Sequence, residues 1–458
     1  MKRLLGLMTT LALATAPLYA RQADREQDED DSRAQRAFAR LSVSLGGTGY
    51  NRVEGLPFLI GPVARSAGPN PFRGRAALIV RTDPVFSLDQ VGYDVQGEKL
   101  LTRRFVIGAG AYSEVRAIED RGLSNVDNSL SAFVFHDDYR DYHNRQGVYL
   151  YAGYAPRRGP LSAAAEFRTE RHDVLGRGHP GSIIKNNSLW RFQPMIAEGK
   201  VHSLAVGLEF DNRGRRRVSG RRGWLIRGEI TKALGGKDLQ FPEVAVTAND
   251  PPLRILTIDP SFTIGMIDVR RYTAIKDLSI NVRLAAGGTL SDRVLPPQYQ
   301  HTLGGRGSLP GLNAPAESPD ATGHAMDCGA RTLTLVSTNL AIGSPRFYPF
   351  YGCDRYVLFQ AQLEGYFGFR IGPEDFSLGG DPTDLIFELV PRWIAFFNAS
   401  QAWAFGAGAL GPFPRTDEDR QYDVGGGVAF GDLGFFVAVP LQGDERGAKL
   451  VVRLGSRF

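Results

Sequence analysis

The last eleven residues of the chain, AKLVVRLGSRF (Ala448–Phe458), alternate between two kinds of side chain. One face of this stretch is apolar and the other is mostly charged, so that Leu450, Val452 and Leu454 alternate with Lys449, Val451 and Arg453. Successive side chains of a β-strand point to opposite faces, and a period of two therefore predicts a strand. The stretch is expected to form a strand with one apolar and one polar face, ending on an aromatic residue.

The same alternation recurs along the chain. It is found in five further stretches, at residues 161–168, 203–211, 224–231, 279–286 and 357–364. In these stretches polar or charged residues stand in mid-strand on one face, while the opposite face stays apolar. The alternative fold, a soluble sandwich, would need a more apolar set of core strands. An apolar face opposite a charged one is typical of an outer-membrane β-barrel, which has lipid outside and a polar lumen.

The composition favours an all-β chain with many turns. The 54 Gly and 27 Pro residues make up about 18% of the 458 residues, against roughly 12% in an average protein. After the first twenty residues no run of about 20 apolar residues occurs, which excludes transmembrane helices. The 54 basic and 49 acidic residues give a net charge of +5, too even to indicate a nucleic-acid partner.

The N-terminus has the layout of a secretory signal. Lys2 and Arg3 precede an apolar stretch, residues 4–14, and a small residue, Ala20, offers a cleavage point. We therefore predict a signal peptide over residues 1–20. Residues 21–40 carry six acidic residues and five Arg with almost nothing to bury, which predicts a disordered leader. Residues 41–458 remain for the barrel, and sixteen strands would leave about 26 residues for each strand and its connection. Twelve or fourteen strands would also fit this length.

Several segments resemble the barrel of the BamA/TamA family of bacterial surface antigens, and they follow the family's order. They are YNRVEGL (Tyr50–Leu56), GLEFDNRGRRRVSGRRGW (Gly207–Trp224), HTLGGRGSLPGL (His301–Leu312), FFNASQAW (Phe396–Trp403), YDVGGGVAF (Tyr422–Phe430) and VVRLGSRF (Val451–Phe458). The resemblance implies a transmembrane antiparallel β-barrel of sixteen strands, with a long loop folded into the lumen. It also implies that Phe458 is a C-terminal assembly signal. The chain resembles a short member without the family's periplasmic POTRA domains.

The segment that resembles the lumen loop departs from the family pattern. Its candidate site residues are Gly304, Gly305, Arg306, Gly307, Pro310, Gly311 and Leu312. In the family an Arg of this loop reaches an Asp on a late strand, whereas this chain has Pro310 and Asn398 at those positions and Ser400 in place of a Gly. The loss of both charged partners together is physically reasonable, because one buried charge left without the other would cost several kcal/mol. We expect residues 303–312 to fold inward on backbone hydrogen bonds, with Arg306 as an alternative anchor.

No motif indicates catalysis or a cofactor. Cys328 and Cys353 are the two cysteines, and in an exported protein such a pair predicts a disulfide. Two cysteines without suitably spaced histidines do not predict a metal site. The chain lacks a nucleophile elbow, and a surface hydrolase is the less favoured alternative to a non-enzymatic barrel. The cluster FHDDYRDYHNR (Phe135–Arg145) is interpreted as a polar turn between strands.

The expected function follows from the resemblance. It is outer-membrane biogenesis, by insertion, translocation or scaffolding of proteins or lipids at the bacterial outer membrane. The alternative is a passive pore or a structural barrel. Expected partners are outer-membrane lipid and a periplasmic protein that supplies the missing modules, but no nucleic acid. Lipopolysaccharide phosphates become a further partner if the basic run at residues 213–222 faces the cell surface.

Overall fold

The structure is a computed structural model that describes most of the chain from residue 37 onward. The described residues are 37–83, 91–119, 123–156, 159–176, 178–184, 190, 193, 196–214, 222–240, 257–291, 293, 295–301, 303–305, 308–311, 325–327, 332–334, 353–367, 391–403, 419–431, 433–441 and 447–454. The predicted signal peptide and residues 21–36 of the predicted leader lie outside these ranges. Residues 38–40 belong to the first strand, because they pair with residues 63–65. The sheet thus begins three residues before the expected boundary at residue 41.

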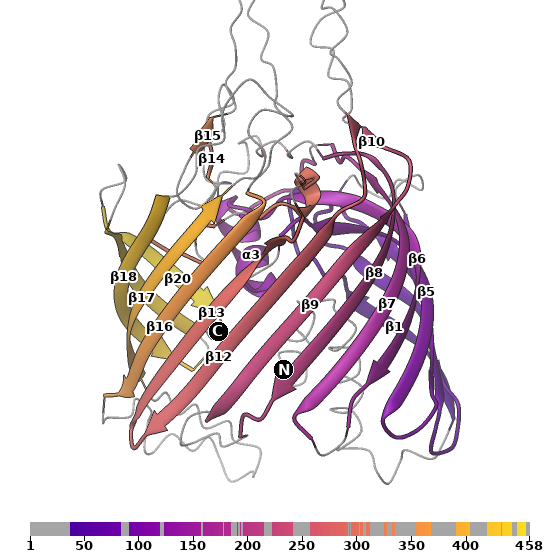
Figure 1. Cartoon of the computed structure of the whole chain (residues 1–458), viewed down its shortest axis with the longest axis horizontal. Helices are drawn as coiled ribbons and strands as arrows, with labels where there is room; N and C mark the ends of the chain where they lie inside the picture. Colours follow the sequence, from indigo (N-terminus) through magenta and orange to yellow (C-terminus); the bar gives the residue numbers. More distant parts are fainter. Residues whose placement is uncertain are drawn as a thin grey trace, which may run out of the picture.

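Sixteen strands of the described chain form one antiparallel sheet in which neighbours in sequence pair with each other (Figure 1). They are β1 (Phe38–Leu45), β2 (Phe58–Arg65), β3 (Phe72–Val80), β4 (Gly92–Leu100), β5 (Phe105–Ala117), β6 (Tyr142–Tyr154), β7 (Leu161–Asp173), β8 (Gly199–Asp211), β9 (Gly223–Gly235), β12 (Thr263–Ile275), β13 (Leu278–Thr289), β16 (Arg355–Tyr366), β17 (Pro391–Trp403), β18 (Asp419–Phe430), β19 (Leu433–Pro440) and β20 (Lys449–Leu454). The predicted all-β fold and the strand number of sixteen are confirmed.

The connections alternate between two ends of the barrel. The β5–β6, β7–β8, β9–β12 and β13–β16 connections lie at one end, here called the loop end, and the short hairpins β12–β13 and β18–β19 lie at the other, the turn end. The loop end carries helix α3 (Asn125–Leu130), the π-helical turn η2 (Ser131–Phe135), the 3-10 turn η3 (Pro297–Tyr299) and two ribbons, β10 (Leu239–Gln240) with β11 (Thr257–Ile258) and β14 (Ala325–Asp327) with β15 (Thr332–Thr334). No helix in the described part of the chain is long and apolar enough to cross a membrane.

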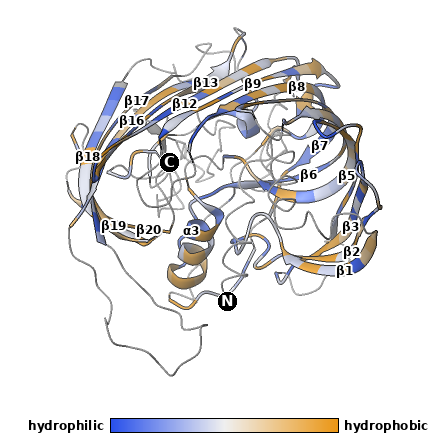
Figure 2. Ribbon diagram, turned by 90° about the horizontal axis from the view of Figure 1, so that it is seen from below, coloured by the Kyte–Doolittle hydropathy of each residue, from blue (hydrophilic) through white to orange (hydrophobic). Residues whose placement is uncertain are grey.

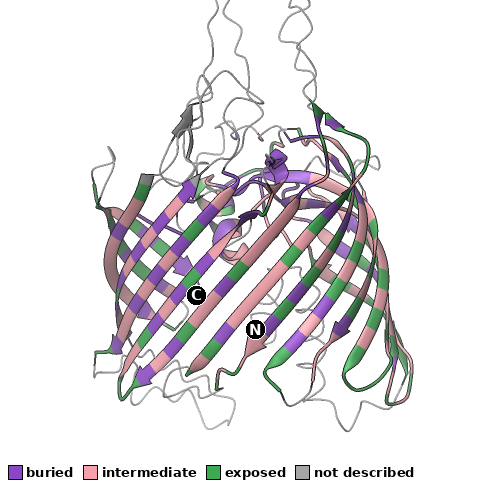
Figure 3. Cartoon of the chain, viewed as in Figure 1, coloured by how far each residue is buried: buried purple, intermediate pink, exposed green. Residues whose placement is uncertain are grey.

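The two faces of the wall differ as the alternation predicts. In β20 the outer residue Leu450 is 69% exposed, whereas the inner residues Val451 and Arg453 are 3% and 5% exposed. Figure 3 shows the same alternation of exposed and buried bands along the neighbouring strands. Exposed residues of the outer face are mainly apolar, and charged residues such as Asp268 and Arg283 are buried inside. The strand faces are therefore set by the local pattern of the sequence.

The first and last strands leave a seam. Among the described residues β1 pairs with β2 alone and β20 pairs with β19 alone. Seen along the barrel in Figure 2, the strands form a ring with a gap between β20 and β1, and α3 lies in that gap. The expectation of a sheet closed on itself is thus not met in the described residues. A helix from the β5–β6 connection occupies the place where the two edges would meet.

Candidate functional site: the lumen belt, the plug cluster and the seam helix

A row of polar side chains crosses the inner wall on five adjacent strands. Arg270, Arg283, Gln360, Asn398 and Asp423 are direct register partners from β12 to β18. Arg283 donates to Gln360 Oε1 at 3.1 Å, and Asn398 Nδ2 donates to Asp423 Oδ1 at 2.5 Å. We call this row, together with the adjacent Asp268, the lumen belt. The row forms because directly paired residues on adjacent strands lie at the same level of the wall, and their side chains point to the same face of the sheet.

Both arginines of the lumen belt pair with Asp268. Asp268 accepts from Arg270 Nη2 at 2.7 Å and from Arg283 Nη2 at 2.9 Å. The two guanidinium groups of the belt thus share the carboxylate of Asp268. This pairing makes the buried arginines tolerable, because an unpaired ion in this environment would be strongly destabilising. Asp423 is fully buried and accepts hydrogen bonds from Asn398 and from the Gly311 N–H.

The lumen loop lies on this belt. The carbonyl oxygen of Ser308 accepts from Gln360 Nε2 at 2.9 Å, and the N–H of Gly311 donates to Asp423 Oδ2 at 2.7 Å. Leu309, at 0% exposure, packs in a cluster with Leu358 and other inner-wall residues. Residues 303–311, where they are described, therefore lie against the inner wall between β13 and β18. This segment is anchored by its backbone.

Glycines allow the tight course of the loop. Gly304 and Gly305 have φ of +120° and +69°, a region that favours glycine. The turn that they make is closed by Ser308, whose hydroxyl accepts from the Gly304 N–H at 2.8 Å. A Cβ on Gly311 would lie 2.9 Å from the Asp423 Cβ and 2.9 Å from the Pro440 nitrogen. The backbone at Gly311 thus approaches the wall more closely than a larger residue could.

The predicted site residues that the structure describes lie in the loop or on the inner face of β17. Pro310 is buried in the loop, and Asn398 contacts Asp423 and Gln360. Ser400 is buried on the same strand, and its hydroxyl has no hydrogen-bond partner among the described residues. Arg306, Gly307 and Leu312 lie outside the described residues. The residue that sequence reasoning missed is Asp423, although a lone acid on the inner face of the Gly-rich YDVGGGVAF strand was a signal for it.

The structure describes one of the two cysteines of the predicted disulfide, Cys353. Cys353 is fully buried beside the lumen loop, and its backbone exchanges two hydrogen bonds with His301, at 2.8 and 2.7 Å. Cys328 lies outside the described residues, so the Cys328–Cys353 bond stays a prediction. Phe458, the predicted assembly signal, also lies outside them.

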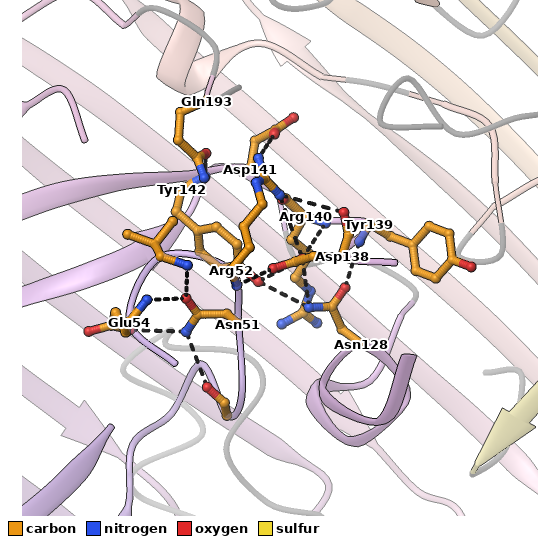
Figure 4. Close-up of polar contacts among 12 residues, drawn as sticks. Asn51, Arg52, Glu54, Asn128, Asp138, Tyr139, Arg140, Asp141, Tyr142 and Gln193 are labelled. Atoms are coloured by element: carbon orange, nitrogen blue, oxygen red, sulfur yellow. Dashed lines mark hydrogen bonds and ion pairs between the residues drawn. The ribbon is translucent and has the colours of Figure 1, made fainter. Parts of the chain in front are cut away.

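A second buried polar group joins the β1–β2 connection to the β5–β6 connection (Figure 4). We call it the plug cluster; its members are Asn51, Arg52, Glu54, Asn128, Asp138, Arg140, Asp141 and Tyr142, all less than 9% exposed. It contains the YNRVEGL stretch. At its centre lies Arg52, which is 1% exposed. Its guanidinium donates to Asp141 Oδ1 at 2.5 Å, and its backbone N–H donates to Asp138 Oδ2 at 2.9 Å.

The FHDDYRDYHNR stretch supplies the other half of the plug cluster. Asn128 Nδ2 and the Tyr142 hydroxyl both donate to Asp138 Oδ1, at 2.9 and 3.1 Å. Arg140 uses its guanidinium to hold Asn125 and the carbonyl of Leu123. The interpretation of this stretch as a simple polar turn is therefore wrong in one respect. Its last four residues belong to β6, and its charged residues Asp138, Arg140 and Asp141 are buried because the β1–β2 connection packs on them.

Two ionisable groups of the β1–β2 connection are perturbed by this packing. Burial raises the pKa of the Glu54 carboxyl, and the Arg81 guanidinium at 2.8 Å opposes that rise. Burial also raises the pKa of Tyr50 to about 12, with the Asp83 and Asp138 carboxylates adding to the rise. The Tyr50 hydroxyl therefore stays protonated and donates to the carbonyl of Gly181. In the described part of the chain no group of three His, Cys, Asp or Glu could hold a metal ion.

Helix α3 ties the two sides of the seam together. Asp127 accepts from the N–H of Leu454 at the end of β20, and Asn125 Nδ2 donates to the carbonyl of Gly47 after β1. Ser124 caps the helix by accepting from the Asp127 N–H at 3.0 Å. The following residues expose large apolar side chains, Leu130, Phe133 and Phe135. The seam is thus bridged by side-chain contacts of one short helix, whereas a ladder joins every other strand pair.

Together these features define the class of protein: a sixteen-stranded, outer-membrane-type β-barrel with an inward loop and a helix-bridged seam. Among solved structures, BamA from Haemophilus ducreyi lacking POTRA domains 1–3 is similar, with a TM-score of 0.50 and 12% identity over 91% of this chain and 70% of that one. The chain therefore has a BamA-like barrel fold. CdiB from Escherichia coli matches with a TM-score of 0.39 and 12% identity, covering 94% of this chain and 69% of that one. No protein-family profile and no curated protein matches the sequence.

Proposed function

We propose that this chain is a barrel of the bacterial outer membrane that acts in membrane biogenesis, inserting, translocating or scaffolding polypeptides or lipids. The observation that carries the proposal is the seam. An unpaired strand edge presents a row of N–H and C=O groups that can pair with another chain. Among the described residues β1 forms a ladder with β2 alone and β20 with β19 alone, and α3 contacts Leu454 of β20 and Gly47 after β1.

The orientation and the partners follow from the same proposal. Transmembrane barrels have short periplasmic turns and longer external loops, so the loop end would face outward. The basic hairpin after β8 would then face the periplasm, which argues against its contact with surface lipopolysaccharide. We propose outer-membrane lipid as one partner and a periplasmic protein as the other, with no enzymatic activity. The inward loop on the lumen belt favours this role over that of an open passive pore.

A disulfide that locks α3 tests the proposal. A Cβ placed on Gly49 would lie 3.4 Å from Ser129 Cβ, close to the range of about 3.5–4.5 Å between Cβ atoms that a disulfide needs. The double variant Gly49→Cys/Ser129→Cys should therefore fix the helix to the β1–β2 connection when oxidised. The assay follows a small outer-membrane barrel as it folds from urea into liposomes that contain this chain.

The expected result is faster folding with the unmodified chain than in empty liposomes. The oxidised double variant should lose that acceleration, and reductant should restore it. The single variant Ser129→Cys and the unmodified chain, each with and without reductant, control for the native cysteines. If the unmodified chain gives no acceleration of folding or lipid transfer and shows steady ion conductance, the passive-pore alternative is correct and the proposal fails.

A further inference from the structure

The outer face of the barrel carries a girdle of aromatic residues at the turn end. These residues lie at or near the turn ends of their strands and point outward by parity: Phe72, Phe105, Tyr154, Trp224, Trp393 and Phe435. Phe105 and Tyr154 touch, with ring centroids 5.0 Å apart. Such girdles mark the level at which a membrane changes from acyl chains to headgroups. The girdle therefore locates the headgroup level of one leaflet on this barrel.

Arg271 lies in the girdle beside Trp224. Arg271 points outward from β12, is exposed, and is the register partner of Trp224 on β9. Its guanidinium carbon lies 5.0 Å from the centre of the Trp224 ring, and it makes no ion pair with any described residue. Lys99, an exposed cation at the turn end of the distant strand β4, donates to the carbonyl of Asn70 at 2.8 Å. Arg271 is thus a positive charge on the lipid-facing surface, and its fork of N–H donors makes no hydrogen bond to any residue that the structure describes.

The chain next to Arg271 is strongly basic. The β8–β9 ladder continues past the wall, because Asn212 pairs with Trp224 at 3.1 Å and Gly214 with Arg222 at 3.0 Å. Between residues 213 and 222 the sequence RGRRRVSGRR holds six Arg and no acidic residue. Arg213 forms an ion pair with Asp211 at 2.9 Å, whereas Arg222, just before β9, is exposed. Arg222 therefore adds a second exposed positive charge on β9's side of the Trp224 ring.

We propose that Arg271, Trp224 and Arg222 form a binding site for the phosphate of an acidic phospholipid. The planar guanidinium binds phosphate through two parallel hydrogen bonds, and its stacking on Trp224 holds that fork at the headgroup level. The acyl chains would lie along the outer face of β9 and β12, over apolar residues such as Ile226 and Ile267. The inference rests on the proposed membrane location and is independent of any role in biogenesis.

Native mass spectrometry of the full chain tests the site. The chain is purified in a non-ionic detergent and titrated with phosphatidylglycerol, or with phosphatidylcholine of the same acyl chains as the zwitterionic reference. We expect Arg271→Gln to weaken phosphatidylglycerol binding about tenfold, because a bidentate charged contact is lost. The matched control is Lys232→Gln, an exposed outward cation at the other end of β9. It should change the affinity less than about twofold, since that end lies away from the girdle.

Other outcomes would overturn the site. If Lys232→Gln and Arg271→Gln weaken binding equally, the attraction is general charge and no site exists. If lipid A binds at Arg271 and phosphatidylglycerol does not, the assigned ligand is wrong. Should Arg271→Gln fail to fold, Arg271→Lys keeps the charge but lacks the planar fork, and unchanged phosphatidylglycerol affinity in that variant would contradict the proposal. None of these results bears on the proposed function, which the folding assay with the locked seam variant tests separately.

Discussion

At the scale of the residue, Asp423 is the carboxylate on which the lumen loop depends. It is fully buried, and its two oxygens receive one donor from the wall, Asn398, and one from the loop, Gly311. In the BamA/TamA family a charge pair joins loop and strand, and this chain has Pro310 and Asn398 at those two positions, which predicts a loop held by backbone hydrogen bonds. Next to Pro310, the N–H of Gly311 donates to Asp423, so in the described residues a backbone group joins the loop to this carboxylate.

Replacing Asp423 should therefore loosen the loop. Asp423→Ala removes the acceptor of Gly311 and leaves a buried N–H unpaired, at a cost of about 1–3 kcal/mol. We expect frequent open events in single-channel recordings of the variant and few in the unmodified chain. Ser400→Ala, at the next inward position after Asn398 along β17, is the control and should behave like the unmodified chain. A quiet Asp423→Ala channel would show that other contacts hold the loop.

Arg52 has the corresponding role in the plug cluster. Its side chain faces two buried carboxylates, Asp138 and Asp141. Arg52→Leu leaves both without their cation, and removing one partner of a buried pair typically destabilises by about 3–5 kcal/mol. The temperature at which the folded band disappears in a heated electrophoresis sample should fall clearly. Arg103→Leu in the exposed β4–β5 turn should leave it unchanged, and adding Asp141→Asn to Arg52→Leu should recover part of the loss.

At the scale of the element, α3 acts where strand pairing is missing. Its N-terminal residues contact β20 and the β1–β2 connection, while its C-terminal continuation exposes apolar side chains. A six-residue helix is too short to be stable by itself, so its tertiary contacts hold it in place. An element of this kind opens at a lower free energy than the strands around it.

Asp127 is the residue that links α3 to β20. Asp127→Ala removes the acceptor of the Leu454 N–H, worth about 1 kcal/mol in a typical case. Hydrogen exchange of residues 449–454 should become several times faster, with no change in β12 or β13. Asp137→Ala, in the same connection, is the control. Equal exchange in Asp127→Ala and the unmodified chain would mean that β20 does not depend on the helix.

The β13–β16 connection has its own predicted constraint. A bond between Cys328 and Cys353 would close a loop of about 25 residues and stabilise it by roughly 3 kcal/mol in the chain-entropy model. Mass spectrometry of protein isolated from the cell envelope, with thiols blocked before digestion, should find the two cysteine peptides linked. Two blocked free thiols in that sample would refute the bond.

At the scale of the whole molecule, orientation decides which side chains meet which compartment. Lys237 lies exposed at the loop end and Asp277 lies exposed in the β12–β13 turn. If the loop end faces outward, a membrane-impermeant maleimide should label Lys237→Cys in intact cells, and Asp277→Cys after the outer membrane is permeabilised. Labelling of Asp277→Cys in intact cells would reverse the orientation and, with it, the leaflet assigned to the girdle.

The wall of the barrel could be predicted from the sequence because strand faces are a local property. The period of two in residues 449–454 and 357–364 assigns each side chain to lipid or lumen without knowledge of its neighbours. Asn398, by contrast, was singled out through the resemblance to the family, as the position of the family's Asp on a late strand. The number of strands came from resemblance, since the length alone also fitted twelve or fourteen.

What the sequence could not determine are the contacts between segments distant in the chain. Asp423 meets Gly311 across 112 residues, Arg52 meets Asp141 across 89, and Asp127 meets Leu454 across 327. Each contact depends on the register of several strands and on how the ring brings their ends together. The alternation of residues thus determined that this chain builds a barrel wall. Only the tertiary structure decided which charges fill the lumen, and that a helix stands in the seam.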